Sequence, residues 1–270
     1  MKNQSSIFKK AHEALISNKI EDKIELTNEL YNGYTDSLTK QSLKCDSKVI
    51  DIPVPGRPEK PELVDIKKLS RRRTGTEEGV LSLLHAIAHI EFNAINLALD
   101  AIYRFRDMPI KYYQDWLKVA KEEAYHFSLI NTHLKERGKQ YGDYSAHNGL
   151  WKMAVKTSYS SLVRMALVPR LLEARGLDVT PHIIEKLERS GEVRSVEILK
   201  IIVNDEVGHV LIGNYWYNYL CEREKVDPIK TFESLLLEHA PGFIRKPFSY
   251  DLRRKAGFSE EEIEALETFV

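Results

Sequence analysis

Residues 122–127 read EEAYHF, and residues 205–210 read DEVGHV. Each string contains an acidic residue, then a glutamate, then a histidine three positions after that glutamate. Because side chains three positions apart lie on one face of an α-helix, Glu123 should point in the same direction as His126, and Glu206 in the same direction as His209. A carboxylate and an imidazole on one helix face provide half of a metal site. The two strings therefore predict two helical half-sites.

Each half-site needs further anionic ligands from a facing helix, and two isolated glutamates could supply them. Glu91 is the only charged residue in the apolar stripe of Leu84, Ile87, Ala88, Glu91, Ala94, Ile95 and Ala98. Glu173 ends a similar stripe that contains Leu162, Ala166 and Pro169. An unpaired charge is costly to bury in such a stripe. We therefore interpret both glutamates as metal ligands.

The spacing of these residues repeats along the chain. Glu123 follows Glu91 by 32 positions, and Glu206 follows Glu173 by 33. The order Glu, Glu-x-x-His, Glu, Glu-x-x-His describes one helical hairpin used twice. The alternative, surface Glu–His pairs and two accidental glutamates, does not account for the matched spacing. The predicted ligands are Glu91, Glu123, His126, Glu173, Glu206 and His209.

The pattern from Thr76 onward is helical, without β-alternation of any length. It predicts a first helix over 79–106, a second over 110–138 and a fourth over 192–224. The third helix should start near Ser158. A crossover at 139–157, with a short separate helical piece at Leu150–Val155, should connect the second helix to the third. Turns are expected at 107–109, with Asp107 as the cap and Pro109 in the first helical position, and at 190–191. We expect the third helix to break between Gly176 and Pro181 without reversing direction, because proline interrupts a helix.

The flanking segments have their own patterns. Residues 6–32 form a charged, helix-prone leader, and residues 46–66 contain four prolines, which is typical of an extended strap. A linker after an independent N-terminal domain is the alternative for this strap. In the tail, Ser259 and Glu262 form a capping-box pattern that predicts one short helix. We expect a single domain, 1–270, with leader and strap at 1–78, a bundle core at 79–224 and a C-terminal cap at 225–270.

Bulk composition limits the classes of function. Forty acidic residues balance forty basic ones, so the net charge does not indicate nucleic acid or anionic membrane as a partner. No apolar run reaches the roughly 18 residues of a membrane span, and residues 1–19 lack a signal-peptide core. Two cysteines, Cys45 and Cys221, are too few for a disulfide framework. We therefore expect a cytoplasmic protein that does not bind membranes.

The ligand order resembles that of the ferritin-like di-iron carboxylate superfamily, over about residues 79–224. In that superfamily two helices each supply one Glu, and the other two each supply Glu-x-x-His. The resemblance implies an all-α fold, a ferritin-like four-helix bundle with a long crossover, with N- and C-terminal helical and extended extensions. It also implies that the six ligands hold two iron ions, with manganese or a mixed iron–manganese pair as alternatives.

Further strings, PVPGRPEKPELV, HAIAHIEFNAINLALD and RKPFSYDLRRKAGF, resemble an uncharacterised bacterial ferritin-like family, a domain of unknown function. That family is more distantly similar to the ferritin-like tRNA hydroxylases. The resemblance implies a di-iron oxidoreductase that activates dioxygen or peroxide, with a hydroxylase or monooxygenase favoured, a small-molecule or tRNA-type substrate and an electron donor. An iron-storage or iron-handling protein is the alternative. The long extensions exceed what a storage shell needs, and they favour a monomeric or dimeric enzyme.

Three residues beside the expected ligands, Glu122, Asp205 and Tyr125, have two interpretations each. Glu122 and Asp205 precede the two liganding glutamates, and the resemblance implies that each supports a liganding histidine; solvated acids are the alternative. Tyr125 is either redox-active or a core or rim tyrosine. Tyr125 and Gly208 occupy the position before the histidine, where multicomponent oxygenases of the superfamily have arginine, which argues against that subgroup.

Other features remain open in the same way. Gly208 and Gly213 either leave room for a substrate or allow close helix packing, and the tail at 243–258 either covers such a pocket or packs on the bundle. His85 and His89 are extra ligands, proton carriers or packing residues. A basic run could contact RNA or an acidic partner, or be solvated; it consists of Lys67, Lys68, Arg71, Arg72 and Arg73.

Overall fold

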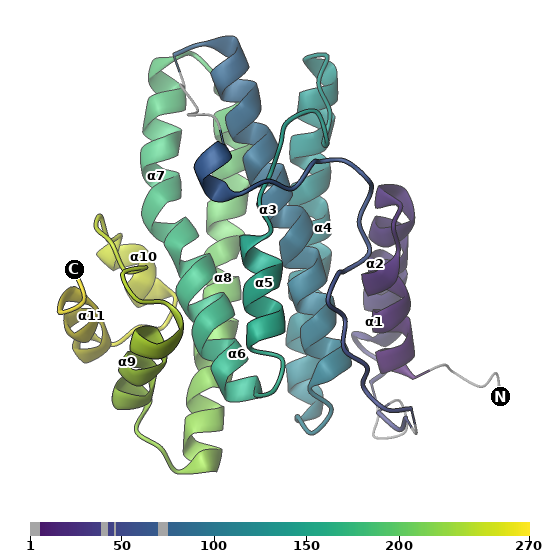
Figure 1. Ribbon diagram of the computed structural model, residues 1–270, viewed down its shortest axis with the longest axis vertical. Coiled ribbons are helices and arrows are strands. Elements are labelled where there is room, and N and C mark those ends of the chain that lie inside the picture. The colour runs from purple at the N-terminus through teal and green to yellow at the C-terminus, as the bar shows by residue number, and fades with distance from the viewer. Residues whose placement is uncertain (1–5, 39–42, 46, 70–74) are drawn as a thin grey trace. The chain divides into compact units, whose positions relative to one another are not determined.

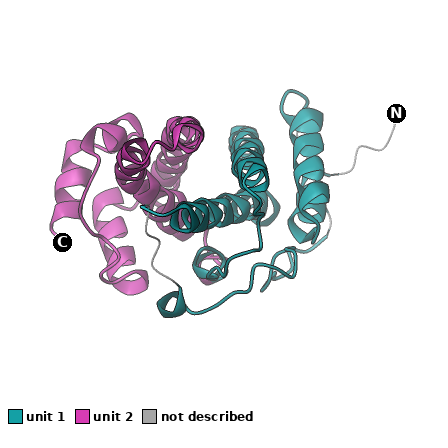
Figure 2. Cartoon of the chain, turned by 90° about the horizontal axis from the view of Figure 1, so that it is seen from above, with its two compact units in different colours: residues 1–155 teal, residues 156–270 magenta. Residues whose placement is uncertain are grey.

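The computed structural model describes residues 6–38, 43–45, 47–69 and 75–270. Over these residues the secondary structure consists of helices, with no strand beyond one isolated bridge between Leu63 and Ala146 (Figure 1). The expected all-α fold class is therefore confirmed. The chain divides into two compact units, residues 1–155 and 156–270 (Figure 2). The expected single domain and its ferritin-like bundle over 79–224 stay predictions, because both would join the two units.

Unit 1 is built around a long helical hairpin. Its helices are α1 (Ile7–Ile16), α2 (Ile20–Tyr34), the short 3₁₀ helix η1 (Ile66–Lys68), α3 (Glu77–Arg104) and α4 (Ile110–Glu136); α5 (Gly149–Lys156) lies at the boundary. The predicted helices at 79–106 and 110–138 and the short piece at 150–155 are confirmed. The Thr76 hydroxyl accepts a hydrogen bond from the Gly79 amide and so caps α3.

The turn between α3 and α4 lies where the sequence predicts it, but it is held differently. Pro109 is the N-cap residue of α4 and not its first helical residue, and no side chain caps this end. Instead, the Tyr113 hydroxyl accepts a hydrogen bond from the Met108 amide (3.3 Å) and donates one to the Phe105 carbonyl (3.0 Å). The expected capping role of Asp107 is therefore wrong, because a tyrosine from the first turn of α4 holds the turn.

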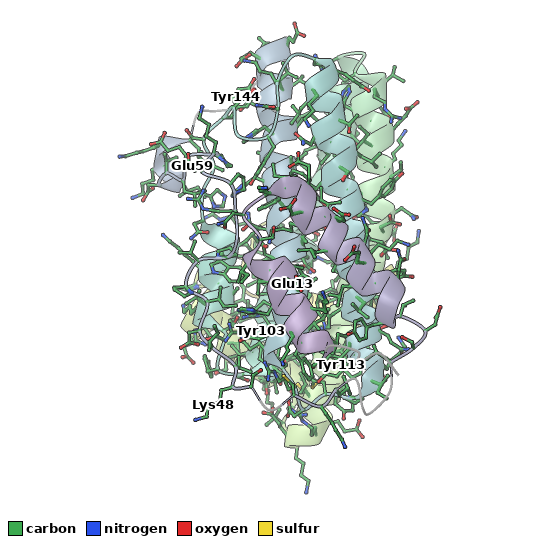
Figure 3. The ribbon with its side chains drawn as sticks, turned by 90° about the vertical axis from the view of Figure 1, so that its right-hand side faces the viewer. Glu13, Lys48, Glu59, Tyr103, Tyr113 and Tyr144 are labelled. Atoms are coloured by element: carbon green, nitrogen blue, oxygen red, sulfur yellow. The ribbon has the colours of Figure 1, made fainter. Side chains whose placement is uncertain are left out.

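The leader forms two helices that pack on this hairpin. The Phe8 ring lies 5.5 Å from the ring of Tyr113, and the His12 ring lies 4.8 Å from that of Tyr103; both tyrosines are labelled in Figure 3. Lys23 of α2 is fully buried and donates hydrogen bonds of 2.8 Å to the carbonyls of Ala14 and Leu15. These carbonyls end α1, where a cation is favourable.

The buried Lys23 predicts a specific pH dependence of stability. Burial lowers the pKa of Lys23 from 10.5 to about 7. Between these values the folded state binds fewer protons than the unfolded chain, so the free energy of unfolding should rise with pH, by up to about 1.4 kcal/mol per unit. Urea unfolding of the wild type and of Lys23→Met at pH 7, 8 and 9 isolates this contribution. The free energy of unfolding of the wild type should rise relative to that of Lys23→Met as the pH increases. A difference in this free energy that stays constant with pH would contradict the prediction.

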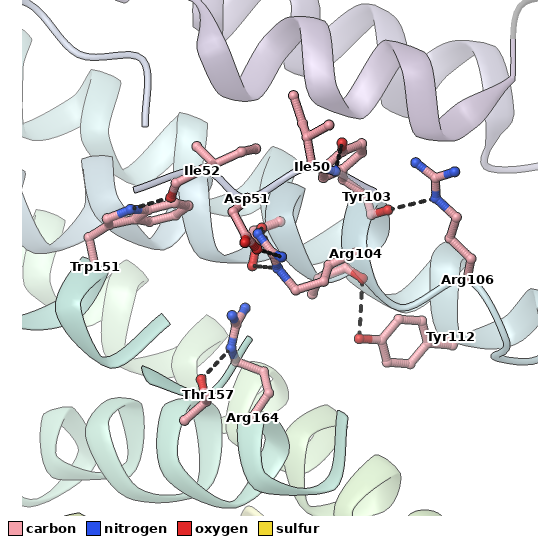
Figure 4. A network of polar contacts seen from close by, with 12 residues as sticks. Ile50, Asp51, Ile52, Tyr103, Arg104, Arg106, Tyr112, Trp151, Thr157 and Arg164 are labelled. Atoms are coloured by element: carbon pink, nitrogen blue, oxygen red, sulfur yellow. Dashed lines mark hydrogen bonds and ion pairs between the residues drawn. The ribbon is translucent and has the colours of Figure 1, made fainter. Parts of the chain in front are cut away.

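The proline-containing strap is extended, as predicted, and is pinned along its length. The Gly56 amide donates to the Leu15 carbonyl (2.9 Å), and the Val64 amide donates to the Ala146 carbonyl (2.8 Å). Figure 4 shows the Trp151 indole donating to the Ile52 carbonyl (3.2 Å). Since the strap and the leader both pack within unit 1, the alternative of a linker after an independent domain is wrong.

Unit 2 contains the remaining helices. They are α6 (Ser161–Leu167), the π-helical segment η2 (Val168–Glu173), α7 (Ala174–Arg189), α8 (Val193–Glu224), α9 (Pro228–His239), α10 (Tyr250–Lys255) and α11 (Glu260–Glu267). The predicted turn at 190–191 is confirmed, with Gly191 at φ +73°. Figure 1 shows α9, α10 and α11 gathered beside α7 and α8. The capping box at Ser259 is confirmed, but the tail has three helices where one was expected.

The expected break between Gly176 and Pro181 is wrong. Helix α7 runs through both residues to Arg189, and the irregularity lies earlier, in η2. Pro169 removes an N–H from the helical ladder there. A Cβ atom on Gly213 of α8 would lie 2.4 Å from the Cβ of Pro169, so α8 approaches this turn very closely. The position of the irregularity is therefore set by packing as well as by proline.

Candidate metal centre

Three of the predicted ligands come together in unit 1. Glu91 of α3 and Glu123 and His126 of α4 are buried, and each offers a ligand atom within 4.8 Å of the others. The His126 Nδ1 atom lies 3.2 Å from Glu91 Oε2 and 3.7 Å from Glu123 Oε2. The α3–α4 turn is midway between Glu91 and Glu123 in the sequence, so the antiparallel hairpin brings them to the same level.

The charges in this cluster favour a cation. Burial by itself would lower the pKa of His126, but hydrogen bonds to Glu123 and Glu91 outweigh burial and raise the pKa to about 11. Two buried carboxylates thus attract positive charge to the imidazole, and a metal ion can take the place of the proton. Two carboxylates and one imidazole form a donor set that suits a divalent transition metal. The residues therefore fit a metal ion.

The second Glu-x-x-His pair lies in unit 2 and repeats this geometry. On α8 the His209 Nδ1 atom lies 3.7 Å from Glu206 Oε1, which is the same separation as between His126 and Glu123. His209 is fully buried, and 13% of the Glu206 side chain is exposed. The predicted shared face is confirmed for both pairs. Glu173 ends η2, which packs on α8. The union of all six residues in one site stays a prediction.

The residues beside the ligands have less specific surroundings. Glu122 forms an ion pair with Lys118 at 3.3 Å, and its side chain is 24% exposed. Asp205 accepts a hydrogen bond from the Asn204 amide at 3.3 Å and is also partly exposed. The proposed support of a liganding histidine by these acids stays a prediction. Tyr125 is 51% exposed, as expected for a rim residue.

His85 and His89 hold the segment between α4 and α5. The His85 Nε2 atom accepts a hydrogen bond from the Gly142 amide at 2.8 Å. The His89 Nδ1 atom lies 2.9 Å from the Tyr141 hydroxyl, and its Nε2 lies 3.0 Å from the His147 carbonyl oxygen. Both histidines thus hold this segment in place, and both nitrogens of His89 are engaged and not available to a metal ion. Their role as proton carriers stays a prediction.

Sequence reasoning missed Tyr141. Its ring centroid lies 5.3 Å from that of Phe92 and 5.1 Å from that of Phe127, the neighbours in sequence of Glu91 and His126. Tyr141 lies in the loop that follows α4 and has no periodic pattern around it. The two histidines one turn apart on α3 were the available signal that an aromatic residue of another segment packs there.

The expected substrate space beside Gly213 is filled by Pro169, so close packing is the correct interpretation for this glycine. In the tail, Phe248 and Phe258 are buried. One cavity between the tail and α7 has a volume of about 10 Å³, which is about the space of one water molecule. A second cavity, lined by α7 and Pro247, has a volume of about 370 Å³. The expected pocket beside Gly208 and its cover by the tail stay predictions.

Two further expectations concern the basic run before α3 and the possibility of a membrane span. Lys67 and Lys68 are exposed, whereas the remainder of the basic run, Arg71–Arg73, lies outside the described residues. Among the described residues, α3 is long and apolar enough to cross a membrane by length and composition alone. However, 72% of its apolar window is buried inside the protein, which is the pattern of a core helix.

Fold and site together define a helical protein, over the described residues, with a buried carboxylate–histidine cluster that could hold a metal ion. The family model described as "Protein of unknown function (DUF455)" matches residues 16–264, and the chain belongs to this family. It is 43% identical over 270 residues to an "Uncharacterized protein" of Haemophilus influenzae (strain ATCC 51907 / DSM 11121 / KW20 / Rd), covering 96% of this chain and 93% of the relative. No solved structure matches the chain. The resemblance to a domain of unknown function is thus confirmed, and its ferritin-like part stays a prediction.

Proposed function

We propose that this protein is a di-metal carboxylate oxidoreductase that activates dioxygen or peroxide, with hydroxylation of a small-molecule or tRNA-type substrate favoured. The observation that carries the proposal is the repeated Glu–His geometry, with a separation of 3.7 Å on both α4 and α8. The separation itself follows from the three-residue spacing on a helix, since His133 and Glu136 lie 3.4 Å apart. The proposed pairs differ because both histidines are completely buried and the two glutamates are at most 13% exposed.

The proposed site follows from the sequence repeat. Glu91, Glu123 and His126 converge within unit 1, and from the repeated order of ligands we infer that Glu206 belongs with them. By the sequence repeat, Glu173 and His209 complete the second half. Four glutamate carboxylates would balance the charge of two divalent ions, so the buried site needs no further anion. We assign Glu123 and Glu206 as the bridging ligands.

Iron is favoured at this site, with manganese or a mixed pair as alternatives, because the donor set is rich in oxygen and contains one imidazole for each metal. When bound, such a metal pair would pass electrons to dioxygen or peroxide and so allow oxidation of a substrate. The protein's own part is to hold the ligands in fixed positions, to keep each histidine neutral at its liganding nitrogen and to exclude water from the carboxylates. An external electron donor is then required as a partner.

Iron handling is the competing function. We favour the enzyme because α1 and α2 pack on the α3–α4 hairpin and the tail helices pack on α7 and α8. These added layers are more than a storage shell requires. Residues outside 79–224 would then serve to support a catalytic site.

Anaerobic loading with Fe(II), followed by exposure to oxygen while absorbance is recorded, tests the proposal. We expect close to two metal ions per chain, a monomer or dimer by light scattering, and oxidation of the reduced protein by oxygen. Separate arms with a small-molecule extract and with tRNA test the substrate class. A protein that binds no metal would refute the proposal, and a large particle that accumulates iron far above two ions per chain would replace it with iron storage.

A further inference from the structure

Arg170, in the middle of the π-helical segment η2, is a buried cation that lies three positions before Glu173. Its Nη2 atom donates to Glu262 Oε1 at 2.7 Å, and its Nη1 donates to Asn214 Oδ1 at 2.8 Å. The guanidinium also lies within 5 Å of three ring centroids, those of Tyr217, Phe232 and Phe258. Burying a charge is costly unless it is paired, and here the pairing of Arg170 comes from residues far away in the sequence.

The partners of Arg170 connect η2 to other parts of unit 2. Glu262 belongs to α11, near the C-terminal end of the chain, and Asn214 belongs to α8. The Asn214 amide also donates to the Ala256 carbonyl at 2.7 Å, just after α10. Arg170 thus joins η2, α8 and the tail. It lies three positions before the proposed ligand Glu173.

A second buried pair lies on the other side of Glu173. Asp178 of α7 accepts two hydrogen bonds from Arg253 of α10, at 2.9 and 2.7 Å, and a third from the Ser249 amide at 3.0 Å. Arg175 donates to the carbonyls of Arg245 and Pro247 at 2.7 and 3.1 Å. The tail therefore holds this helix both before and after Glu173.

The π-helical turn makes the orientation of Glu173 depend on such contacts. A π turn contains about one residue more than an α turn, and each residue of an α-helix advances by about 100°. If η2 relaxed to α-helix, the residues after it would rotate by about 100° relative to those before it. Single π turns are rare and occur mostly at functional sites. Contacts that stabilise the π-helical conformation of η2 therefore also fix the direction in which the Glu173 side chain points.

We propose that the two clamps, Arg170–Glu262 and Arg253–Asp178, are positioning residues for the metal ligand Glu173. This inference rests on the proposed function, because it assumes that Glu173 binds metal. It assigns the C-terminal tail to the support of the metal centre. Arg253 of α10 binds the ligand-bearing helix after the π-helical turn, and Glu262 of α11 binds the turn itself, while α8 approaches the same turn at Gly213.

Glu262→Gln tests the inference, and Glu260→Gln is its matched control. Glutamine removes the charge facing Arg170 but can still accept the hydrogen bond from the Ser259 amide in the capping box. Glu260 lies on the same helix and binds Arg254 in an exposed pair, at 2.6 and 3.1 Å. With Mn(II) and a chromophoric chelator as competitor, we expect Glu262→Gln to weaken binding by roughly 10- to 100-fold and Glu260→Gln to leave it unchanged.

A double-mutant cycle separates positioning from general stabilisation. In a Glu173→Ala background, Glu262→Gln should no longer change the affinity for Mn(II), because the residue on which it acts is gone. An equal loss of affinity in both backgrounds would overturn the inference. If Glu262→Gln fails to fold, Asp178→Asn applies the same cycle to the second clamp.

Hydrogen exchange in the metal-free protein gives a readout that does not depend on metal. Amides of 168–175 should exchange faster in Glu262→Gln than in the wild type or in Glu260→Gln. If the wild type binds no metal, the proposed function fails, and faster exchange at 168–175 still supports the clamp on this turn. Unchanged exchange in Glu262→Gln overturns the inference, whether or not the wild type binds metal.

Discussion

Replacing both Glu123 and Glu206 by alanine is expected to remove nearly all bound metal. Both residues are proposed bridging ligands, and Glu123 is completely buried. Loss of residues that merely orient metal ligands typically costs 10- to 100-fold in affinity, so loss of two bridging ligands should cost more than about 100-fold. Metal content after loading, measured by elemental analysis, is the readout. Two ions per chain in the double variant would refute the site assignment.

The control for this experiment lies on the same two helices. Glu136 of α4 is exposed and lies 3.4 Å from the buried His133, three positions before it, so it is an exposed glutamate with a histidine spacing like that of the proposed ligands. Glu222 of α8 is also exposed. The Glu136→Ala and Glu222→Ala double variant should keep its metal. The ligand variant should stay folded without metal, because removing the buried Glu123 carboxylate and the partly buried Glu206 carboxylate also removes the cost of desolvating them.

Gly213→Ala is expected to destabilise the protein, whereas Gly176→Ala should stabilise it. A Cβ atom at Gly213 would lie 2.4 and 2.6 Å from the Cβ and Cγ of Pro169, which cannot move away without shifting η2. Overpacking of this kind typically costs 1–3 kcal/mol. Gly176 is also inside a helix of unit 2, but its Cβ would meet nothing within 4 Å. There alanine should gain roughly 0.5–1 kcal/mol.

Thermal and urea unfolding of the two variants provide the measurement. A folded and fully stable Gly213→Ala protein would show that α8 does not approach η2 as closely as the structure describes. Gly213→Ala should also affect the metal centre, because the turn that it displaces ends at the proposed ligand Glu173. Weaker metal binding in Gly213→Ala than in Gly176→Ala is therefore expected.

Local patterns identified the half-sites and the turns. A Glu-x-x-His string on a helix places both side chains on one face whatever the rest of the chain does, and both pairs have the expected geometry. The Pro228 helix could also have been predicted, because Asp227 caps it by accepting a hydrogen bond from the Lys230 amide at 2.8 Å. The pattern of a capping residue followed by proline in the first turn was the unused signal.

The sequence by itself thus determined the helical class, the long hairpin and the two half-sites, since helical periodicity and turn residues act over a few positions. Tertiary structure decided the rest. The helix irregularity lies at 168–173 and not at 176–181; Pro169 stands there, and α8 packs closely against it at Gly213. His89 binds Tyr141, 52 positions away, so its role depends on where a distant loop packs. Contacts between residues far apart in the chain leave no periodic trace in the sequence, and only the folded chain shows them.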